Sequence, residues 1–128
     1  MKKTPKLNIF SGPEAVLHPV LTAHADAIVL SSDTIQMLRL KKSDKVELAN
    51  QQNNRKKWYI RRNPKAGYGL SIESNGEHTT AVLNNSGEIT SVIRKIFEVA
   101  KENALVGTIS TKEEFNGWFA INFLPVKL

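Results

Sequence analysis

The chain has 128 residues, no cysteine and a formal net charge of +6 at pH 7. This length fits one domain with its own core, and the lack of cysteine excludes a disulfide framework, a thiol nucleophile and sulfur-ligated zinc. No apolar run approaches the ~18 residues of a membrane span. We therefore expect a single domain over residues 1–128, located in the cytoplasm, with no membrane partner and no cofactor.

The first 40 residues predict short strands and one short helix. A strand is expected at residues 7–10, whereas Pro19 favours a loop or an edge strand, because proline cannot donate to a strand ladder. The apolar run at 27–30 predicts a buried strand. Two serines follow this run and can cap a helix over residues 32–39.

Alternating apolar and polar side chains indicate a series of strands through the rest of the chain. Asn75-Gly76 is a strong hairpin signal between two of them. Strands are expected at residues 45–49, 56–62, 68–72, 79–83, 105–109 and 117–124.

The clearest helix is expected at residues 86–102. Its apolar residues recur at helical spacing and form one stripe: Ile89, Val92, Ile93, Ile96, Phe97 and Ala100. Because this stripe must be buried, we expect the helix to cover one face of the sheet. The predicted fold class is therefore α+β, with a mostly antiparallel curved sheet of about six strands, one long covering helix (86–102) and one short helix (32–39).

The surplus positive charge lies in one window, between Glu47 and Glu73. The window holds no acidic residue, and the rest of the chain balances 12 basic residues against 12 acidic ones. Its aromatic residues are Trp58, Tyr59 and Tyr68. A local cationic patch with aromatic rings suits a polyanion, above all nucleic acid.

The sharpest inference in this window concerns alternate residues of the strand at 56–62. If Trp58 and Ile60 pack inward, then Lys57, Tyr59 and Arg61 point outward together. The cations could then contact phosphates while a base stacks on Tyr59, an interaction of about 1–3 kcal/mol per base. The competing interpretation is a solvated strand face. The full predicted nucleic-acid site is Arg55, Lys56, Lys57, Tyr59, Arg61, Arg62 and Lys65.

Residues 27–62 resemble half of a SpoVT/AbrB-type DNA-binding protein. The matching parts are the strand Ala27-Ile28-Val29-Leu30, the helix and its exit at 33–40, the turn and strand at 41–48, and a final strand at Trp58-Tyr59-Ile60. The resemblance implies a DNA-binding packing unit. The basic residues that this family places near its first strand and helix start are absent here, so its DNA-contact positions do not carry over.

A second resemblance concerns the order of elements. Residues 44–103 predict four strands and then a long helix, an order similar to that of the single-stranded-DNA-binding coactivator and whirly group. In that group a curved antiparallel sheet binds the strand and the helix supports the sheet. The resemblance implies that the basic strand at 56–62 lies on the binding sheet.

The three histidines do not predict a metal site, because His18 and His24 have no cysteine or paired carboxylate nearby. A nuclease would need His78 to converge with a carboxylate such as Glu77, its neighbour on the opposite strand face. We therefore expect a non-enzymatic nucleic-acid-binding protein, weakly specific or preferring single strands. The alternative is a protein–protein interaction or assembly factor of a mobile element or phage, forming a homodimer or larger homo-oligomer through the apolar strand from Trp118 to Phe123.

Overall fold

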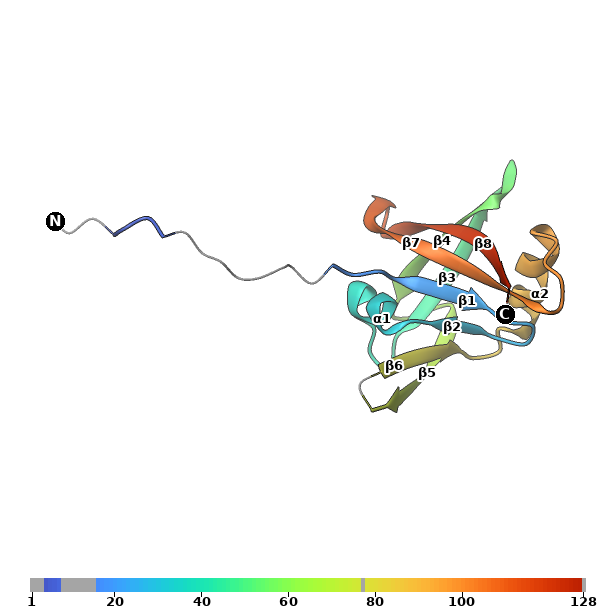
Figure 1. Cartoon of the computed structure of the whole chain (residues 1–128), viewed down its shortest axis with the longest axis horizontal. Coiled ribbons are helices and arrows are strands. Elements are labelled where there is room, and N and C mark those ends of the chain that lie inside the picture. The colour runs from blue at the N-terminus through green and yellow to red at the C-terminus, as the bar shows by residue number, and fades with distance from the viewer. Residues whose placement is uncertain (1–3, 8–15, 77, 128) are drawn as a thin grey trace.

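The computed structural model describes residues 4–7, 16–76 and 78–127. Eight antiparallel strands form one closed barrel, in the order β1-β2-β6-β5-β3-β4-β8-β7 (Figure 1). The strands are β1 (Val20–Ala23), β2 (Ile28–Leu30), β3 (Lys45–Gln51), β4 (Asn54–Asn63), β5 (Tyr68–Asn75), β6 (His78–Leu83), β7 (Asn103–Phe115) and β8 (Trp118–Lys127). The strand predicted at residues 7–10 lies, apart from Leu7, outside the described residues.

The predicted six-stranded curved sheet with a long covering helix is wrong. The sheet closes because β1 pairs with both β2 and β7, so that Leu21 lies opposite Leu30 on one side and Gly107 on the other. Inward side chains from the eight strands then fill the barrel and bury one another. The fully buried members include Leu21, Ile28, Leu30, Val46, Ile60, Leu83 and Leu105. The core therefore lies inside the sheet rather than between the sheet and a helix.

The predicted helix over 86–102 is also too long. The helix α2 spans Gly87–Ile96, Phe97 is its C-cap, and Glu98 has a left-handed φ of 53° that turns the chain away. Phe97 packs against Phe123 from β8, with ring centroids 5.3 Å apart. The stripe therefore helps to close the barrel at one end and does not cover a sheet face.

The short helix predicted at 32–39 is present as α1 (Ser32–Leu38), which begins at the N-cap Ser31 and ends at Arg39, whose φ is 54°. Figure 1 shows α1 and α2 at opposite ends of the barrel. Neither helix, within the described ranges, is long and apolar enough to cross a membrane.

Two of the hairpins that extend beyond the barrel lie next to the predicted nucleic-acid site. The strand β4 pairs with β8 only at Trp58, Tyr59 and Ile60, so residues 50–57 continue past β8 as a two-stranded ribbon. Figure 1 shows this ribbon projecting above α2. The second hairpin, residues 110–118, joins β7 to β8 and has an irregular register. The two projections flank the outer face of β4, where the predicted nucleic-acid site lies.

Candidate nucleic-acid interface

The expectation that Tyr59 offers an exposed ring is wrong, because only 3% of the residue is exposed. Trp58 and Ile60 do join the barrel core. On the outer face, however, the 110–118 hairpin covers Tyr59, whose ring centroid lies 5.3 Å from that of Phe115 in an edge-to-face contact. The Tyr59 hydroxyl accepts a hydrogen bond of 2.8 Å from Gln51 Nε2. A base therefore cannot stack on Tyr59.

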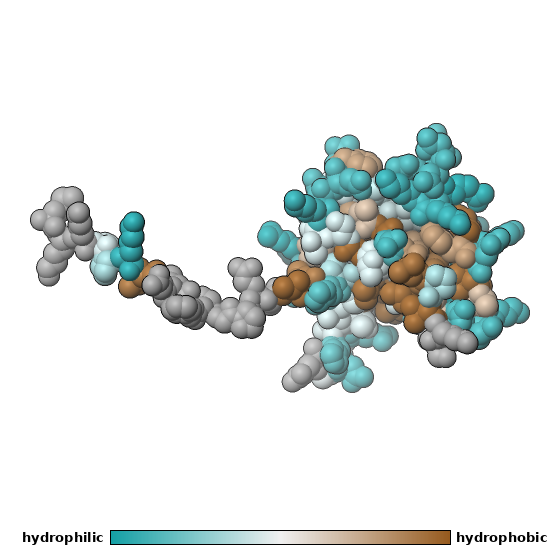
Figure 2. Space-filling model, turned by 45° about the horizontal axis from the view of Figure 1, so that its top comes forward, coloured by the Kyte–Doolittle hydropathy of each residue, from teal (hydrophilic) through white to brown (hydrophobic). Residues whose placement is uncertain are grey.

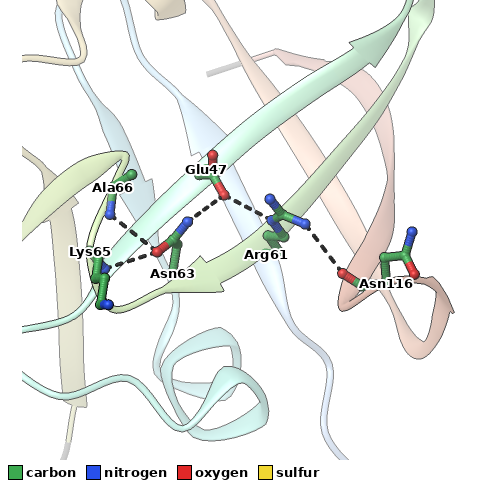
Figure 3. Close-up of polar contacts among 6 residues, drawn as sticks. All are labelled: Glu47, Arg61, Asn63, Lys65, Ala66 and Asn116. Atoms are coloured by element: carbon green, nitrogen blue, oxygen red, sulfur yellow. Dashed lines mark hydrogen bonds and ion pairs between the residues drawn. The ribbon is translucent and has the colours of Figure 1, made fainter.

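Arg61 is held by a carboxylate from the neighbouring strand. Glu47 lies opposite Arg61 in the β3–β4 register, and Arg61 Nε donates to Glu47 Oε1 over 2.8 Å (Figure 3). The guanidinium also lies 4.3 Å from the ring centroid of Trp118, a cation–π contact. Arg61 is thus fixed in place and about one third of its side chain remains exposed.

Glu47 has a second partner, Asn63, whose Nδ2 donates to the same carboxylate oxygen over 2.8 Å (Figure 3). The hydrogen bonds from Asn63 and Arg61 stabilise the ionised carboxylate and lower the pKa of Glu47 below its ordinary value of 4.5. Glu47 therefore carries a full negative charge at neutral pH and offsets the charge of Arg61.

Arg62 and Lys65 lie at the opposite end of β4 from the ribbon. Arg62 Nη1 contacts Oδ2 of the buried Asp44 at 3.4 Å. Lys65 is exposed in the turn after β4, where its backbone N–H donates to Asn63 Oδ1 (Figure 3). The structure therefore does not bring the seven predicted residues together on one surface.

The remaining predicted cations, Arg55, Lys56 and Lys57, lie together on the projecting ribbon and are exposed. Within the described residues, ion pairs form only between Arg61 and Glu47 and between Arg62 and Asp44. The ribbon cations are thus without a carboxylate partner in that part of the chain.

Two grooves adjoin the ribbon. Lys56 and Lys57 border a groove of about 390 Å³ whose other wall comes from β7 and β8. Arg55 borders a groove of about 420 Å³ together with Lys95 of α2. Lys56 also lies 6.0 Å from the ring centroid of Phe97. A fourth cation, Lys95, thus lies beside the ribbon. It is outside the cationic window of the sequence.

Sequence reasoning missed Phe115, which is 48% exposed beside Tyr59. The available signal was the Asn116-Gly117 dipeptide between two aromatic residues, since this pair favours tight hairpin turns. Both residues have positive φ, 47° and 81°. A turn at this position brings Phe115 and Trp118 opposite each other and places aromatic rings on the outer face of β4 and β8.

The other predicted residues form no site in the described ranges. His78 is exposed at the start of β6, Glu77 lies outside the described residues, and the backbone N–H of His18 donates to Asp33. The apolar strand proposed for assembly turns Ile121 and Phe123 into the barrel core. No family model matches this chain, and no curated protein or solved structure is significantly similar to it.

Proposed function

We propose that the protein binds single-stranded nucleic acid with weak sequence specificity, through the ribbon cations and the exposed ring of Phe115. The observation that carries this proposal is the group of three consecutive exposed cations, Arg55, Lys56 and Lys57, without ion-pair partners among the described residues. Such cations attract phosphates by releasing the counterions condensed on them. This interface keeps the ribbon part of the predicted site and replaces Tyr59 with Phe115.

The spacing of outward side chains along β4 supports a path for a single strand of nucleic acid. Lys57, Tyr59 and Arg61 occupy alternate positions, about 7 Å apart, and Phe115 lies against the middle one. A base stacked on Phe115 would therefore have Lys57 on one side and the partly exposed Arg61 on the other. Stacking needs an exposed base face, which a single strand offers and an intact duplex does not. This requirement is why we propose single-stranded ligands.

The first test measures affinity as a function of salt. Fluorescence anisotropy of a labelled oligo(dT) of 12 nucleotides, at 50 and 200 mM NaCl, gives the slope of log affinity against log salt. With three phosphates neutralised, the slope for a single strand is about −2. A labelled duplex of the same length should bind more weakly. An affinity that does not change with salt would overturn the phosphate mechanism.

The second test compares charge-matched variants. Arg55→Gln/Lys57→Gln should weaken oligo(dT) binding at least tenfold and reduce the salt slope. Lys42→Gln/Lys65→Gln removes two exposed charges away from the ribbon and should have little effect. Phe115→Ala should weaken binding about 5- to 150-fold, from the ~1–3 kcal/mol of one base stack. Equal losses in both double variants would indicate attraction by net charge and not a ribbon site.

The second candidate function is self-association, because one observation favours it. The register places an uncharged row of outer-face residues across five neighbouring strands: Leu124, Val106, Thr22, Val29 and Val82. Leu124 is 58% exposed, and Figure 2 shows an apolar area on this side of the molecule, bordered by hydrophilic side chains. Two copies could pack here without burying a charge. Light scattering should then show a dimer that Leu124→Glu converts to a monomer.

A further inference from the structure

A cavity with cationic residues on its wall lies at the end of the barrel where α1 packs, and we call this cavity the mouth. Arg62 continues the inward series of Trp58 and Ile60 along β4, and Phe119 lies opposite Ile60 on β8. Together with the end of α1, they surround a cavity of about 440 Å³. Cavities of about 300–1,000 Å³ hold small ligands, and barrel mouths are frequent positions for them.

Three cations from separate segments line this cavity. Arg39 follows α1, Lys41 precedes β3, and Arg62 lies near the end of β4. Arg39 and Lys41 are exposed, and neither forms an ion pair within the described residues. The fold thus brings three cationic residues to the wall of one cavity, although residues 39 and 62 are 23 positions apart in the sequence.

Arg62 retains most of its hydrogen-bonding capacity. A guanidinium has five N–H donors, and Arg62 makes one side-chain hydrogen bond among the described residues, the 3.4 Å contact with Asp44. The same Asp44 oxygen accepts the backbone N–H of Lys41 over 2.8 Å. Asp44 is buried and therefore holds Arg62 and the Lys41 turn in place, while 43% of the Arg62 side chain stays exposed toward solvent.

The rest of the wall is apolar. Met37, Leu38 and Phe119 line the cavity beside the cations. A thioether and a phenyl ring pack well against a flat ring, and an arginine binds a phosphate through two parallel hydrogen bonds. The cavity thus offers an apolar wall for a ring and a cationic rim for a dianion.

We propose that this mouth binds a phosphate monoester carried by a planar ring, the chemistry of a mononucleotide. The ligand could be a free nucleotide or the phosphorylated end of a strand, because both present the same groups. The phosphate would contact Arg62, Lys41 and Arg39, and the ring would lie on Phe119. The site lies at the opposite end of β4 from the ribbon and does not depend on the function proposed above.

The test is isothermal titration calorimetry of the full chain with adenosine 5′-monophosphate. We expect saturable binding at about one site per chain, whereas adenosine and inorganic phosphate alone should each bind at least tenfold more weakly. A 5′-phosphorylated oligo(dT) compared with its 5′-hydroxyl form separates the two sources of ligand. A strand-end site requires tighter binding of the phosphorylated form, and equal affinities assign the site to free nucleotides. Adenosine binding as tightly as its monophosphate would overturn the proposal.

Variants locate the site. Lys41→Gln and Arg62→Gln should each weaken binding of the monophosphate about tenfold, the loss of one charged hydrogen bond, whereas the neighbouring exposed Lys42→Gln should not change it. Thermal unfolding checks that Arg62→Gln still folds, and Lys41→Gln removes no side-chain contact that the structure shows. If both variants bind as the wild type does, the ligand does not occupy this cavity.

One further variant should tighten binding of the monophosphate instead of weakening it. Glu113 Oε1 lies 3.9 Å from the point that a Cβ on Gly117 would occupy, and Gly117 lines the cavity. Glu113→Gln removes this nearby negative charge and should tighten binding about two- to threefold. Because Arg55→Gln/Lys57→Gln should leave binding of the monophosphate unchanged, failure of this proposal can be distinguished from failure of the ribbon proposal.

Discussion

Gly107→Ala tests whether the barrel is closed and packed as the structure describes. Gly107 points into the barrel between the inward side chains of Ile121 and Phe123. A Cβ on Gly107 would lie 2.4 Å from Ile121 Cγ2 and 2.9 Å from a ring carbon of Phe123. Both distances are far shorter than the ~3.5–4.0 Å of a normal carbon contact, so the neighbours must move.

The cost follows from what can move. Ile121 and Phe123 are only 5% exposed, and both belong to β8, which pairs with β7 on one side and in part with β4 on the other. Because overpacking a well-packed core costs about 1–3 kcal/mol, we expect Gly107→Ala to cost about 3 kcal/mol. In a two-state chain of this size that shifts Tm by roughly 10 °C.

Urea unfolding followed by tryptophan fluorescence measures this cost. Ile121→Ala removes the clashing Cγ2, so the double variant Gly107→Ala/Ile121→Ala should be more stable than the sum of the two single losses, by about 1–2 kcal/mol. Gly76→Ala is the contrast, because no atom of the described residues, its chain neighbours apart, lies within 4 Å of the position of its Cβ. Only the left-handed backbone then contributes, about 1 kcal/mol. Additive losses, or a Gly107→Ala protein as stable as wild type, would refute this packing.

Three further variants test single features of the structure. Glu47→Gln should destabilise the folded chain at pH 7, and the loss should become progressively smaller as the pH falls below about 4.5. The reason is that the lowered pKa of Glu47 stabilises the folded state only while the carboxylate is ionised. Urea unfolding at pH 7, 5 and 3 measures this loss. Trp58→Phe should cost about 1 kcal/mol or less in the same assay, because Trp58 Nε1 is buried with no acceptor among the described residues and its removal offsets lost contacts. Arg39→Gly should raise Tm, since glycine relieves the left-handed φ of 54° by about 0.5–1 kcal/mol, while it weakens binding of adenosine 5′-monophosphate.

Local patterns predicted the strands better than their arrangement. Alternation placed strands at most positions where they occur, and Ser31 and Ser32 indicated the start of α1. Closure of the barrel has no such signal, because it depends on β1 pairing with β7, a contact between residues more than 80 positions apart. With only four residues and Pro19 before it, β1 resembles a loop in the sequence.

The helix predicted at 86–102 is too long because tertiary contacts end it earlier than its apolar pattern does. The apolar spacing of residues 89–100 is regular, so the pattern favours a helix that continues through Phe97. In the fold, Phe97 contacts Phe123 at the end of the barrel, and Arg94 donates to the carbonyl oxygens of Ala23 and Ala100. These contacts stabilise a turn after Ile96 and outweigh the one or two helical turns that the pattern would add.

The sequence also predicted too large a nucleic-acid site on β4, and the cause lies in the topology of the sheet. A window without acidic residues is cationic along the chain, but a strand in a sheet meets the charges of its neighbours. The β3–β4 register sets Glu47 opposite Arg61, and the turn before β3 brings Asp44 to Arg62. Where pairing ends, residues 55–57 have no carboxylate opposite them among the described residues, whereas Arg61 and Arg62 each contact a carboxylate of a neighbouring segment and stay only partly exposed. Charge segregation in a sequence therefore predicts unpaired cations best for the part of a strand that extends beyond its neighbours.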